Sequence, residues 1–584
     1  MRGDRVPEAK SGREVEWQFD ALDVRPVERW LAPYVATATA GLAGDEGDAG
    51  VSAGSRGAGP ARFTVRPEPA RFQVDVYADT DDWRLFRAGF SLRVRRHGRA
   101  AEATLKSFAP PKDGLRDRSE LNEAVPNLDL DTLPASGGEV GRRVRAVAGT
   151  RPLQRILEVR TRRQKYALEV GGRGAAEIAL DRTSIRSAPG QEPARLRRVE
   201  VEMRDGELET VEPFVRAMAE QCGLRPAKLS KFEAGLMALG LGPPPPPDLG
   251  PVEVGPAPSV GELAFAALRR HFGAFLENEP GTRLGEDPDA LHDMRVATRR
   301  IRAAIKLFEE VLPVRVVRAR DELRWVADAL GAVRDLDVQL ERLQGWIDEA
   351  DRGDREPLAA LRGVLESERE EARAVLLEVL DSARYRRLVT GLIGLLRRGP
   401  LRTSPASRVP AVVVAPELAA ARYRKVRKAA RRLKGDPAPE DFHRVRIRGK
   451  RFRYTLEFLS ELYGDEPGPL IKRLEKLQDH LGLLQDAVVA VARLRGLAVR
   501  EDLSPTTVFA MGQVAERYRR QAADLQKRAP KVYRQVLGKR WKELHKTMER
   551  VRAASGWSDR RPVLRPVEPA PTPAIVPAAT GGSA

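Results

Sequence analysis

The chain has 584 residues, of which 42% are hydrophobic, and this is enough apolar material for the cores of more than one domain. Lysine and arginine number 102 against 83 aspartates and glutamates, and the net charge of +19 indicates a polyanionic partner, although an arginine-rich coding bias would produce the same excess. The single cysteine excludes an internal disulfide framework and a zinc site of paired cysteines, and the absence of an apolar N-terminal segment or membrane-length stretch predicts a cytoplasmic protein that does not enter a membrane.

Three low-complexity stretches divide the sequence. Residues 36–61 are rich in Gly and Ala and are interpreted as an insertion, whereas residues 564–584 form a Pro- and Ala-rich tail expected to be disordered. Residues 242–258 contain a run of prolines and are interpreted as a linker. This linker separates an N-terminal module, residues 13–241, from a C-terminal module, residues 259–550.

Apolar and charged residues alternate along the N-terminal module, and this period of two predicts β-strands. Glu14 and Glu16, for example, alternate with Trp17 and Phe19. An antiparallel sheet with one solvated face would give this pattern. A closed barrel would give it as well, with the charged face lining the lumen, where a divalent cation and a phosphate chain would satisfy both signs of charge.

Two details of the barrel interpretation can be checked in a structure. Arg160 and Arg162 are placed on the charged, lumen-facing side of their strand, opposite Leu157 and Val159. The apolar outer face of the barrel is expected to carry helices, and residues 211–221 and 230–239 are examples.

The C-terminal module shows the spacing of long amphipathic helices, so an all-α fold is predicted. The expected helices are residues 259–278, 288–312, 314–347, 356–380, 383–398, 417–434, 440–463, 467–497, 505–528 and 530–552. A shift of 151 residues aligns residues 292–343 with 443–494 without a gap. The duplication predicts two helical bundles related by a pseudo-twofold axis.

Cationic residues recur at helical spacing in both copies of the repeat, and each row begins with one of the chain's six histidines. The first row contains His292, Arg295, Arg299, Arg302 and Lys306, and the second contains His443, Arg446, Lys450 and Arg453. A solvated basic face is the ordinary explanation of such a row. The recurrence in both copies favours an anion between the two rows, because like charges at this spacing repel one another.

Six short motifs in the N-terminal module occur in the order found in CYTH domains, the triphosphate tunnel metalloenzymes. They are Glu14-x-Glu16, Leu92-Arg93-Val94-Arg95, Thr104-Leu105-Lys106, Arg118-x-Glu120, Glu177-Ile178-Ala179-Leu180-Asp181 and Glu200-x-Glu202. The resemblance implies the barrel, with flanking helices, and a site for Mg²⁺ or Mn²⁺ together with inorganic triphosphate.

The residue roles that this resemblance implies fall into three groups. The metal would be held by Glu14, Glu16, Asp181, Glu200 and Glu202. The triphosphate would be bound by Arg93, Arg95, Lys106, Arg118, Arg160, Arg162 and Lys231. Lys106 and Glu120 are the implied catalytic residues of metal-assisted hydrolysis. The chain departs from the family pattern at Gln18 and Asn122, where a lysine and an acid are expected.

The repeat resembles CHAD domains, helical modules named for conserved histidines. Leu291-His292-Asp293-Met294-Arg295 and Phe442-His443-Arg444-Val445-Arg446 carry the resemblance. It implies that inorganic polyphosphate binds along the two cationic rows, and it would place the protein in the cytoplasm or at polyphosphate granules.

Three functions remain open from the sequence. The first is a metal-dependent hydrolase of inorganic triphosphate or short polyphosphate with a polyphosphate-binding helical domain. The second is a non-catalytic polyphosphate-binding or granule-associated protein with a degenerate tunnel, which Gln18 would explain. Nucleic-acid binding is weaker, because only 5% of the residues are aromatic and no groove-reading motif is evident. The oligomeric state is left open.

Overall fold

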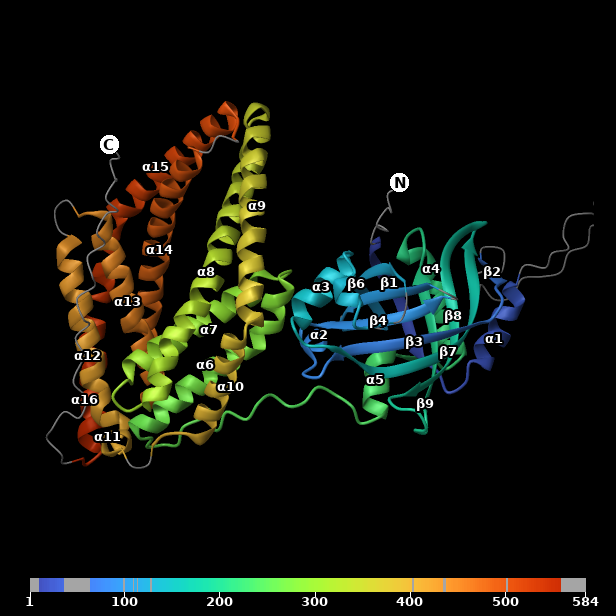
Figure 1. Ribbon diagram of the computed structural model, residues 1–584, viewed down its shortest axis with the longest axis horizontal. Helices are drawn as coiled ribbons and strands as arrows, with labels where there is room; N and C mark the ends of the chain where they lie inside the picture. Colours follow the sequence, from blue (N-terminus) through green and yellow to red (C-terminus); the bar gives the residue numbers. More distant parts are fainter. Residues whose placement is uncertain are drawn as a thin grey trace, which may run out of the picture. The chain divides into compact units, whose positions relative to one another are not determined.

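The computed structural model describes residues 10–35, 63–97, 100–108, 110–112, 114–126, 129–401, 404–433, 437–499 and 503–557. The predicted insertion at 36–61 and all residues after 557, including the predicted tail, lie outside these residues. Contacts within the chain define two compact units, one formed by Met1–Pro246 and Pro280–Asp287 and the other by Pro247–Glu279 and Pro288–Ala584 (Figure 1).

Within the described residues, eight antiparallel strands of the N-terminal unit form a closed barrel, which confirms the predicted fold class (Figure 1). The strands are β1 (Lys10–Asp20), β3 (Arg71–Thr80), β4 (Phe90–His97), β5 (Ala100–Ser107), β6 (Leu115–Val125), β7 (Leu153–Val170), β8 (Arg173–Arg186) and β9 (Ala194–Met203). Their order around the barrel is β1-β6-β5-β4-β3-β7-β8-β9, and pairing of β9 with β1 closes it. The short strands β2 (Phe63–Pro67) and β10 (Arg225–Pro226) pair with β7 and β1.

Strand β1 connects the two edges of the sheet and brings acidic residues to the seam. Its Glu14 lies opposite Arg118 of β6, and its Glu16 lies opposite Glu202 of β9. Because alternate side chains of a strand point to opposite faces, Glu14 and Glu16 share the lumen while Trp17 is buried on the other side. The predicted alternation of this strand is therefore correct.

Helices cover the outer face of the barrel in two places. Helices α1 (Arg25–Leu31) and α4 (Leu208–Gln221) pack on an apolar cluster that includes Trp17 and Phe214. Helix α3 (Glu139–Ala148) packs on a second cluster around Leu92. The short helices α2 (Arg84–Arg87), η1 (Ala32–Tyr34) and η2 (Leu133–Ala135) complete the connections. The expected outer helix at residues 211–221 thus lies within α4.

The helix expected at 230–239 packs against residues inside the barrel and not on its outer face. Its contacts show that the predicted orientation of β7 is wrong. Phe232 of α5 (Lys231–Ala238) lines the cavity inside the barrel and packs with Leu157 and Val159 in one buried cluster. The odd-numbered residues of β7 therefore face inward, and the exposed Arg160 and Arg162 face outward. The prediction that these two arginines line the tunnel is wrong, because burying the apolar pair against α5 fixes the opposite register.

From Val260 onward, the described elements of the C-terminal unit are helices joined by short connections, and no helix there or elsewhere in the described chain is long and apolar enough to cross a membrane. Its helices are α6 (Val260–Leu284), α7 (Pro288–Leu307), α8 (Val314–Glu349), α9 (Arg352–Asp381), α10 (Ala383–Arg398), α11 (Pro405–Arg408), α12 (Ala411–Ala430), α13 (Pro439–Leu459), α14 (Gly468–Leu497), α15 (Pro505–Val536) and α16 (Lys539–Ala554), with the 3₁₀ turns η3 (Arg431–Leu433) and η4 (Ser460–Leu462).

One helix boundary differs from the prediction for a physical reason. The break expected near residue 529 is absent, because α15 continues through Pro530 to Val536. The buried side chains of Tyr533 and Val536 pack beyond the proline and offset the backbone hydrogen bond that it cannot make. The chain breaks instead at Gly538, directly before α16.

The duplication is visible in the order and contacts of the helices. Helices α7 and α8 correspond to α13 and α14 under the shift of 151 residues, and each pair packs together (Figure 1). One large apolar cluster joins both pairs with α6, α10, α12 and α16, while a second joins the distal parts of α8, α9, α14 and α15. Helix α7 also contacts α13, so the two predicted cationic rows lie on neighbouring helices.

Candidate functional site

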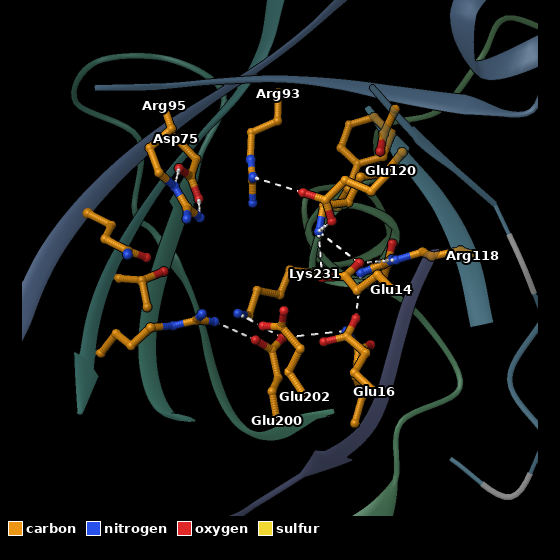
Figure 2. A pocket seen from close by; sticks show the side chains of 18 of the residues that line it. Glu14, Glu16, Asp75, Arg93, Arg95, Arg118, Glu120, Glu200, Glu202 and Lys231 are labelled. Carbon is orange, nitrogen blue, oxygen red and sulfur yellow. Dashed lines mark hydrogen bonds and ion pairs between the residues drawn. The ribbon is translucent and has the colours of Figure 1, made fainter. Parts of the chain in front are cut away.

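The barrel encloses a polar cavity of about 360 Å³, and Figure 2 shows charged side chains of both signs facing one another across it. Its acidic lining residues are Glu14, Glu16, Asp75, Glu102, Glu120, Glu177, Glu200 and Glu202. Its basic lining residues are Arg93, Arg95, Lys106, Arg118, Arg163, Lys165, Arg204 and Lys231. Most of the predicted tunnel residues are thus brought together, whereas Arg160 and Arg162 are not.

An acidic group forms where β1 meets β9. Gln18 is 2% exposed, and its amide donates a hydrogen bond of 2.7 Å to Glu16 and one of 3.5 Å to Glu200. The amide oxygen of Gln18 is buried and has no hydrogen-bond partner among the described residues. The neutral amide of Gln18 therefore bridges the carboxylates of Glu16 and Glu200.

The two acids of this group titrate in opposite directions. Burial, together with the nearby carboxylates of Glu200 and Glu14, raises the pKa of Glu16 to about 7 against the opposing effect of Arg118. Burial also acts to raise the pKa of Glu200, but Lys231 and Arg163 hold it well below its ordinary value. Glu16 is thus the carboxylate whose negative charge is least compensated.

Basic side chains pair with acids on both sides of the cavity. Lys106 lies 2.9 Å from Glu14 and 2.6 Å from Glu120, and Arg118 lies 2.8 Å from Glu14. Burial acts to raise the pKa of Glu14, but Lys106 and Arg118 hold it below its ordinary range. The predicted catalytic pair, Lys106 and Glu120, is therefore in direct contact.

The fully buried Asp181 has two cationic partners, Arg163 of β7 and Lys231 at the start of α5. The same two cations also pair with Glu200, and the distance from Lys231 to Glu200 is 2.9 Å. Asp181, predicted as a metal ligand, thus contributes by anchoring two of the basic groups. The capping box between Ser230 and Glu233 fixes the first turn of α5 and with it the position of Lys231.

The other wall carries the remaining predicted arginines. Arg95 forms an ion pair of 2.6 Å with Asp75, whereas Arg93 donates to Thr104 at 3.0 Å and lies 3.9 Å from Glu120. Asn122 accepts a hydrogen bond of 2.7 Å from the hydroxyl of Thr104. Asn122 therefore orients the residue that contacts Arg93.

The residue roles predicted from the sequence leave out six charged lining residues, which are Asp75, Glu102, Arg163, Lys165, Glu177 and Arg204. Arg163 and Lys165 share the inward side of β7 with Thr161, but the local sequence does not show which side of this strand faces inward. Asp75 lies between Val74 and Val76 in β3, and a buried acid in such a place indicates a paired cation.

The carboxylates fit a divalent cation by their chemistry. No group of three or more His, Cys, Asp or Glu side chains in the described parts of the chain is already arranged to hold a metal ion. Carboxylate oxygens are the ligands that Mg²⁺ and Mn²⁺ prefer, and burial raises the pKa of both Glu16 and Glu202. A cation would relieve this crowding, so Glu14, Glu16, Glu200 and Glu202 are the residues that would hold it.

A second group of cations lies between α7 and α13 in the C-terminal unit. It comprises Arg295 and Arg299 of α7 with Arg446, Lys450 and Arg453 of α13. Burial lowers the pKa of Arg295 and of Arg446, and the positive charge of Arg299 adds to this effect at both. We call these five residues the basic cluster.

Tyr454 connects the two halves of the basic cluster. Its hydroxyl accepts a hydrogen bond of 2.5 Å from Arg299 of α7, and the guanidinium of Arg453 lies 5.1 Å from the centre of its ring. The first repeat has no equivalent, because Ala303 occupies the corresponding position. Tyr454 thus fixes two arginines that would otherwise repel.

Two glycines lie beside arginines of the cluster. An added Cβ at Gly331 of α8 would lie 3.7 Å from the guanidinium of Arg295, and one at Gly482 of α14 would lie 3.8 Å from that of Arg446, both ordinary contact distances. The two contacts correspond to each other under the repeat shift. The duplicated Leu-Gly pair therefore marks the place where each arginine lies against the neighbouring helix.

The remaining residues of the predicted rows lie outside the basic cluster. Arg302 is influenced by Asp328, Arg324 and Arg320 of α8, and Lys306 pairs with Glu309 at 2.6 Å. His443 makes a hydrogen bond of 2.8 Å to Gln485. His292, by contrast, lies near Arg334 and Arg299, and burial lowers its pKa.

Several donor atoms on these helices have no acceptor. Among the described residues, the buried Nε atoms of Arg300, Arg302, Arg446 and Arg453 and the Nδ1 atom of His292 lack a hydrogen-bond partner. Buried polar atoms are almost always paired, so these atoms are exceptions, and two of them, the Nε atoms of Arg446 and Arg453, belong to the basic cluster.

Comparisons with known proteins agree with this division of the chain. Residues 61–236 match the family model described as the CYTH domain, and residues 266–495 match the one described as the CHAD domain. The chain is 28% identical over 519 residues to the uncharacterized protein Rv2226 of Mycobacterium tuberculosis (strain ATCC 25618 / H37Rv), covering 83% of this chain and 93% of that protein.

Solved structures are similar to parts of the chain. PptA from Streptomyces chartreusis is 23% identical, with a TM-score of 0.40, over 47% of this chain and 99% of its own. The CHAD domain from the plant Ricinus communis is 28% identical, with a TM-score of 0.38, over 51% of this chain and 93% of its own.

Proposed function

The chain contains a CYTH domain followed by a CHAD domain, and on this premise we propose that it is a metal-dependent hydrolase of inorganic triphosphate or short polyphosphate whose helical domain binds polyphosphate. The CYTH family is metal-dependent and binds triphosphate substrates. Mg²⁺ or Mn²⁺ is the proposed ion for this chain.

The observation that carries the proposal is the presence of both signs of charge around one closed cavity. Arg93, Arg95 and Lys231 on one side would contact phosphate oxygens, and Arg163 joins them in place of Arg160 and Arg162. A divalent cation held by the β1 and β9 carboxylates would neutralise charge on the phosphoryl group that is transferred.

The chain's own residues can manage the proton of the attacking water. Glu120 is 14% exposed in its side chain and lies 2.6 Å from Lys106, so its carboxylate is placed where it could accept that proton. Lys106 would then be free to stabilise charge on the departing phosphate, since its other partner Glu14 would turn to the cation.

For the helical domain, the supporting observation is the set of buried donor atoms without acceptors beside the basic cluster. Inorganic polyphosphate supplies closely spaced anionic oxygens, which suit arginine donors along a helix. Nucleic acid is not favoured, because aromatic residues make up only 5% of the chain and the aromatic ring within the basic cluster, Tyr454, is buried.

A non-catalytic polyphosphate-binding or granule-associated protein is the second candidate. It is favoured by Gln18, because a neutral amide stands between two carboxylates where a lysine would bring a full positive charge. In this case the cavity would hold phosphate chains without cleaving them.

A phosphate-release assay on the full chain separates the two candidates. We expect turnover of tripolyphosphate with Mn²⁺ or Mg²⁺ that is abolished by a chelator and lowered by a hundredfold or more in Glu120→Gln, in line with loss of a general base. Retained binding of long-chain polyphosphate without any turnover would establish the second candidate. Competition with duplex DNA at fixed salt tests the polyphosphate preference, and stronger binding of DNA per phosphate would contradict it.

A further inference from the structure

Lys450 is the lysine of the basic cluster, and it lies among four arginines. Arg446 and Arg453 flank it on α13, and Arg295 and Arg299 face it from α7. Under the repeat shift, Lys450 occupies the position that Arg299 occupies in the first copy. The two positions therefore differ in whether the side chain can lose its proton, because an arginine stays protonated when buried and a lysine need not.

No carboxylate compensates Lys450. On α13 and α14, Glu457 and Glu475 pair with Arg453 at 3.2 and 3.1 Å, and no ion pair or hydrogen bond of Lys450 is found within the described residues. On α8, Asp335 lies 3.5 Å from Arg295.

The remaining charges around α13 are also engaged elsewhere. Asp486 of α14 pairs with Arg342 at 3.2 Å, and Arg422 of α12 interacts with Arg448 and Arg451 on another side of α13. The four charged groups that act most strongly on Lys450 are all positive. Burial, together with these four arginines, lowers the pKa of Lys450 to about 7.

We propose that Lys450 couples the binding of a polyanion to the uptake of one proton from solvent. The free site holds four permanent charges and a lysine that is largely neutral at mildly alkaline pH. A bound phosphate chain neutralises the arginines and offers oxygens to the lysine, so the Nζ atom of Lys450 takes up a proton and becomes an ammonium. No covalent bond is made or broken in this step.

This inference rests on the proposed binding of polyphosphate to the helical domain, and it adds a regulatory property to it. Binding of polyphosphate would weaken as the pH rises through the pKa of free Lys450, because protonation of the lysine then costs more free energy at the lower proton concentration. The site would therefore hold polyphosphate more tightly in a slightly acidic environment.

The test is calorimetry of the full chain with inorganic polyphosphate at pH 8 in two buffers of different ionisation enthalpy. The difference in heat gives the number of protons taken up, which we expect to be about 0.9 per site for a group of pKa near 7 that is fully protonated when bound. Burial lowers the pKa of His292, and any proton that this histidine takes up on binding would be counted equally in a variant that changes Lys450 alone.

Lys450→Arg is the matched variant, because it keeps the positive charge and removes the titration. Proton uptake should fall nearly to zero, and affinity at pH 8 should rise by about tenfold, the factor that the missing proton costs the native lysine. Between pH 7.5 and 8.5 the native chain should lose about eightfold in affinity, whereas the variant should lose almost none.

The outcomes are distinguishable from those of the proposed function. Tight binding with equal proton uptake in the native chain and Lys450→Arg would overturn the role of Lys450 while leaving polyphosphate binding intact. If neither protein bound polyphosphate, although circular dichroism showed both to be folded, this inference and the binding function would fall together.

Discussion

Replacing Gln18 by lysine is expected to raise turnover in the tunnel. The amide of Gln18 now donates to Glu16 at 2.7 Å and to Glu200 at 3.5 Å, and these acids also engage Arg118 and Lys231. An ammonium at position 18 would compensate both acids directly. Arg118 and Lys231 would then be less firmly held and freer to contact phosphate.

The size of the effect follows from the hydrogen bonds that change. A hydrogen bond between a charged donor and a carboxylate contributes about 1 to 2 kcal/mol more than one from a neutral amide, after the cost of removing the ammonium from water. If this gain is expressed in the transition state, kcat/KM for tripolyphosphate should rise by roughly five- to thirtyfold.

The pH dependence should change in the same variant. The pKa of Glu16 is raised to about 7, so its carboxylate is lost as the pH falls through 7, and activity that needs this carboxylate should fall with it. The lysine would lower the pKa of Glu16 and move the acidic limb of kcat/KM to lower pH by about one unit or more.

The measurement is phosphate release from tripolyphosphate with Mn²⁺ between pH 5.5 and 8.5, for Gln18→Lys and for Gln18→Met as an uncharged control of similar size. Gln18→Met should have lower activity than the native chain, because it leaves Glu16 and Glu200 without the shared donor. The reasoning would be refuted if Gln18→Lys left both the rate and the acidic limb unchanged.

Two further substitutions test the geometry of each domain. Arg163→Met should lower tripolyphosphate turnover by at least a hundredfold, because it leaves the buried Asp181 with one cation. Arg162→Met, on the outer face of the barrel, should change turnover by less than twofold. Equal effects of the two substitutions would contradict the inward register of β7. Tyr454→Phe should weaken polyphosphate binding by about fivefold through loss of the hydrogen bond that holds Arg299, and unchanged affinity in a salt-controlled titration would show that Tyr454 has no positioning role.

The tunnel could be predicted from the sequence where a strand alternates without ambiguity. Strand β1 separates Glu14 and Glu16 from Trp17 and Phe19, and only one register buries the aromatic residues. The run Arg160-Thr161-Arg162-Arg163 allows either register by itself. The register is decided by Phe232, a residue far away in the chain that packs on Leu157 and Val159, and a local pattern carries no information about that contact.

In the helical domain the sequence predicted the repeat and its cationic residues, but not which of these residues would meet in the basic cluster. Helical spacing places Arg295 and Arg302 on one side of α7, yet Arg295 joins the basic cluster and Arg302 lies near charges of α8. Which turns of a helix meet its neighbour depends on where the two helices cross, and spacing along one helix cannot give that.

The cations of the tunnel are paired with acids, whereas those of the basic cluster lie close to one another. The two domains would therefore bind a phosphate chain in different ways. In the tunnel, Lys106, Arg118, Arg163 and Lys231 each pair with buried carboxylates, so a phosphate chain must exchange one ionic partner for another. Such an exchange gains little from charge alone unless a divalent cation takes over the released acids.

The basic cluster instead keeps its positive charges close together, with buried donors that have no acceptor nearby in the described chain. A polyanion there removes repulsion and supplies acceptors in one step, so its binding should be strong at low ionic strength and steeply weakened by salt. Binding in the tunnel should respond to the metal, and binding in the helical domain to salt and pH. If the proposed binding is correct, we expect the helical domain to hold polyphosphate under conditions in which the tunnel does not engage it.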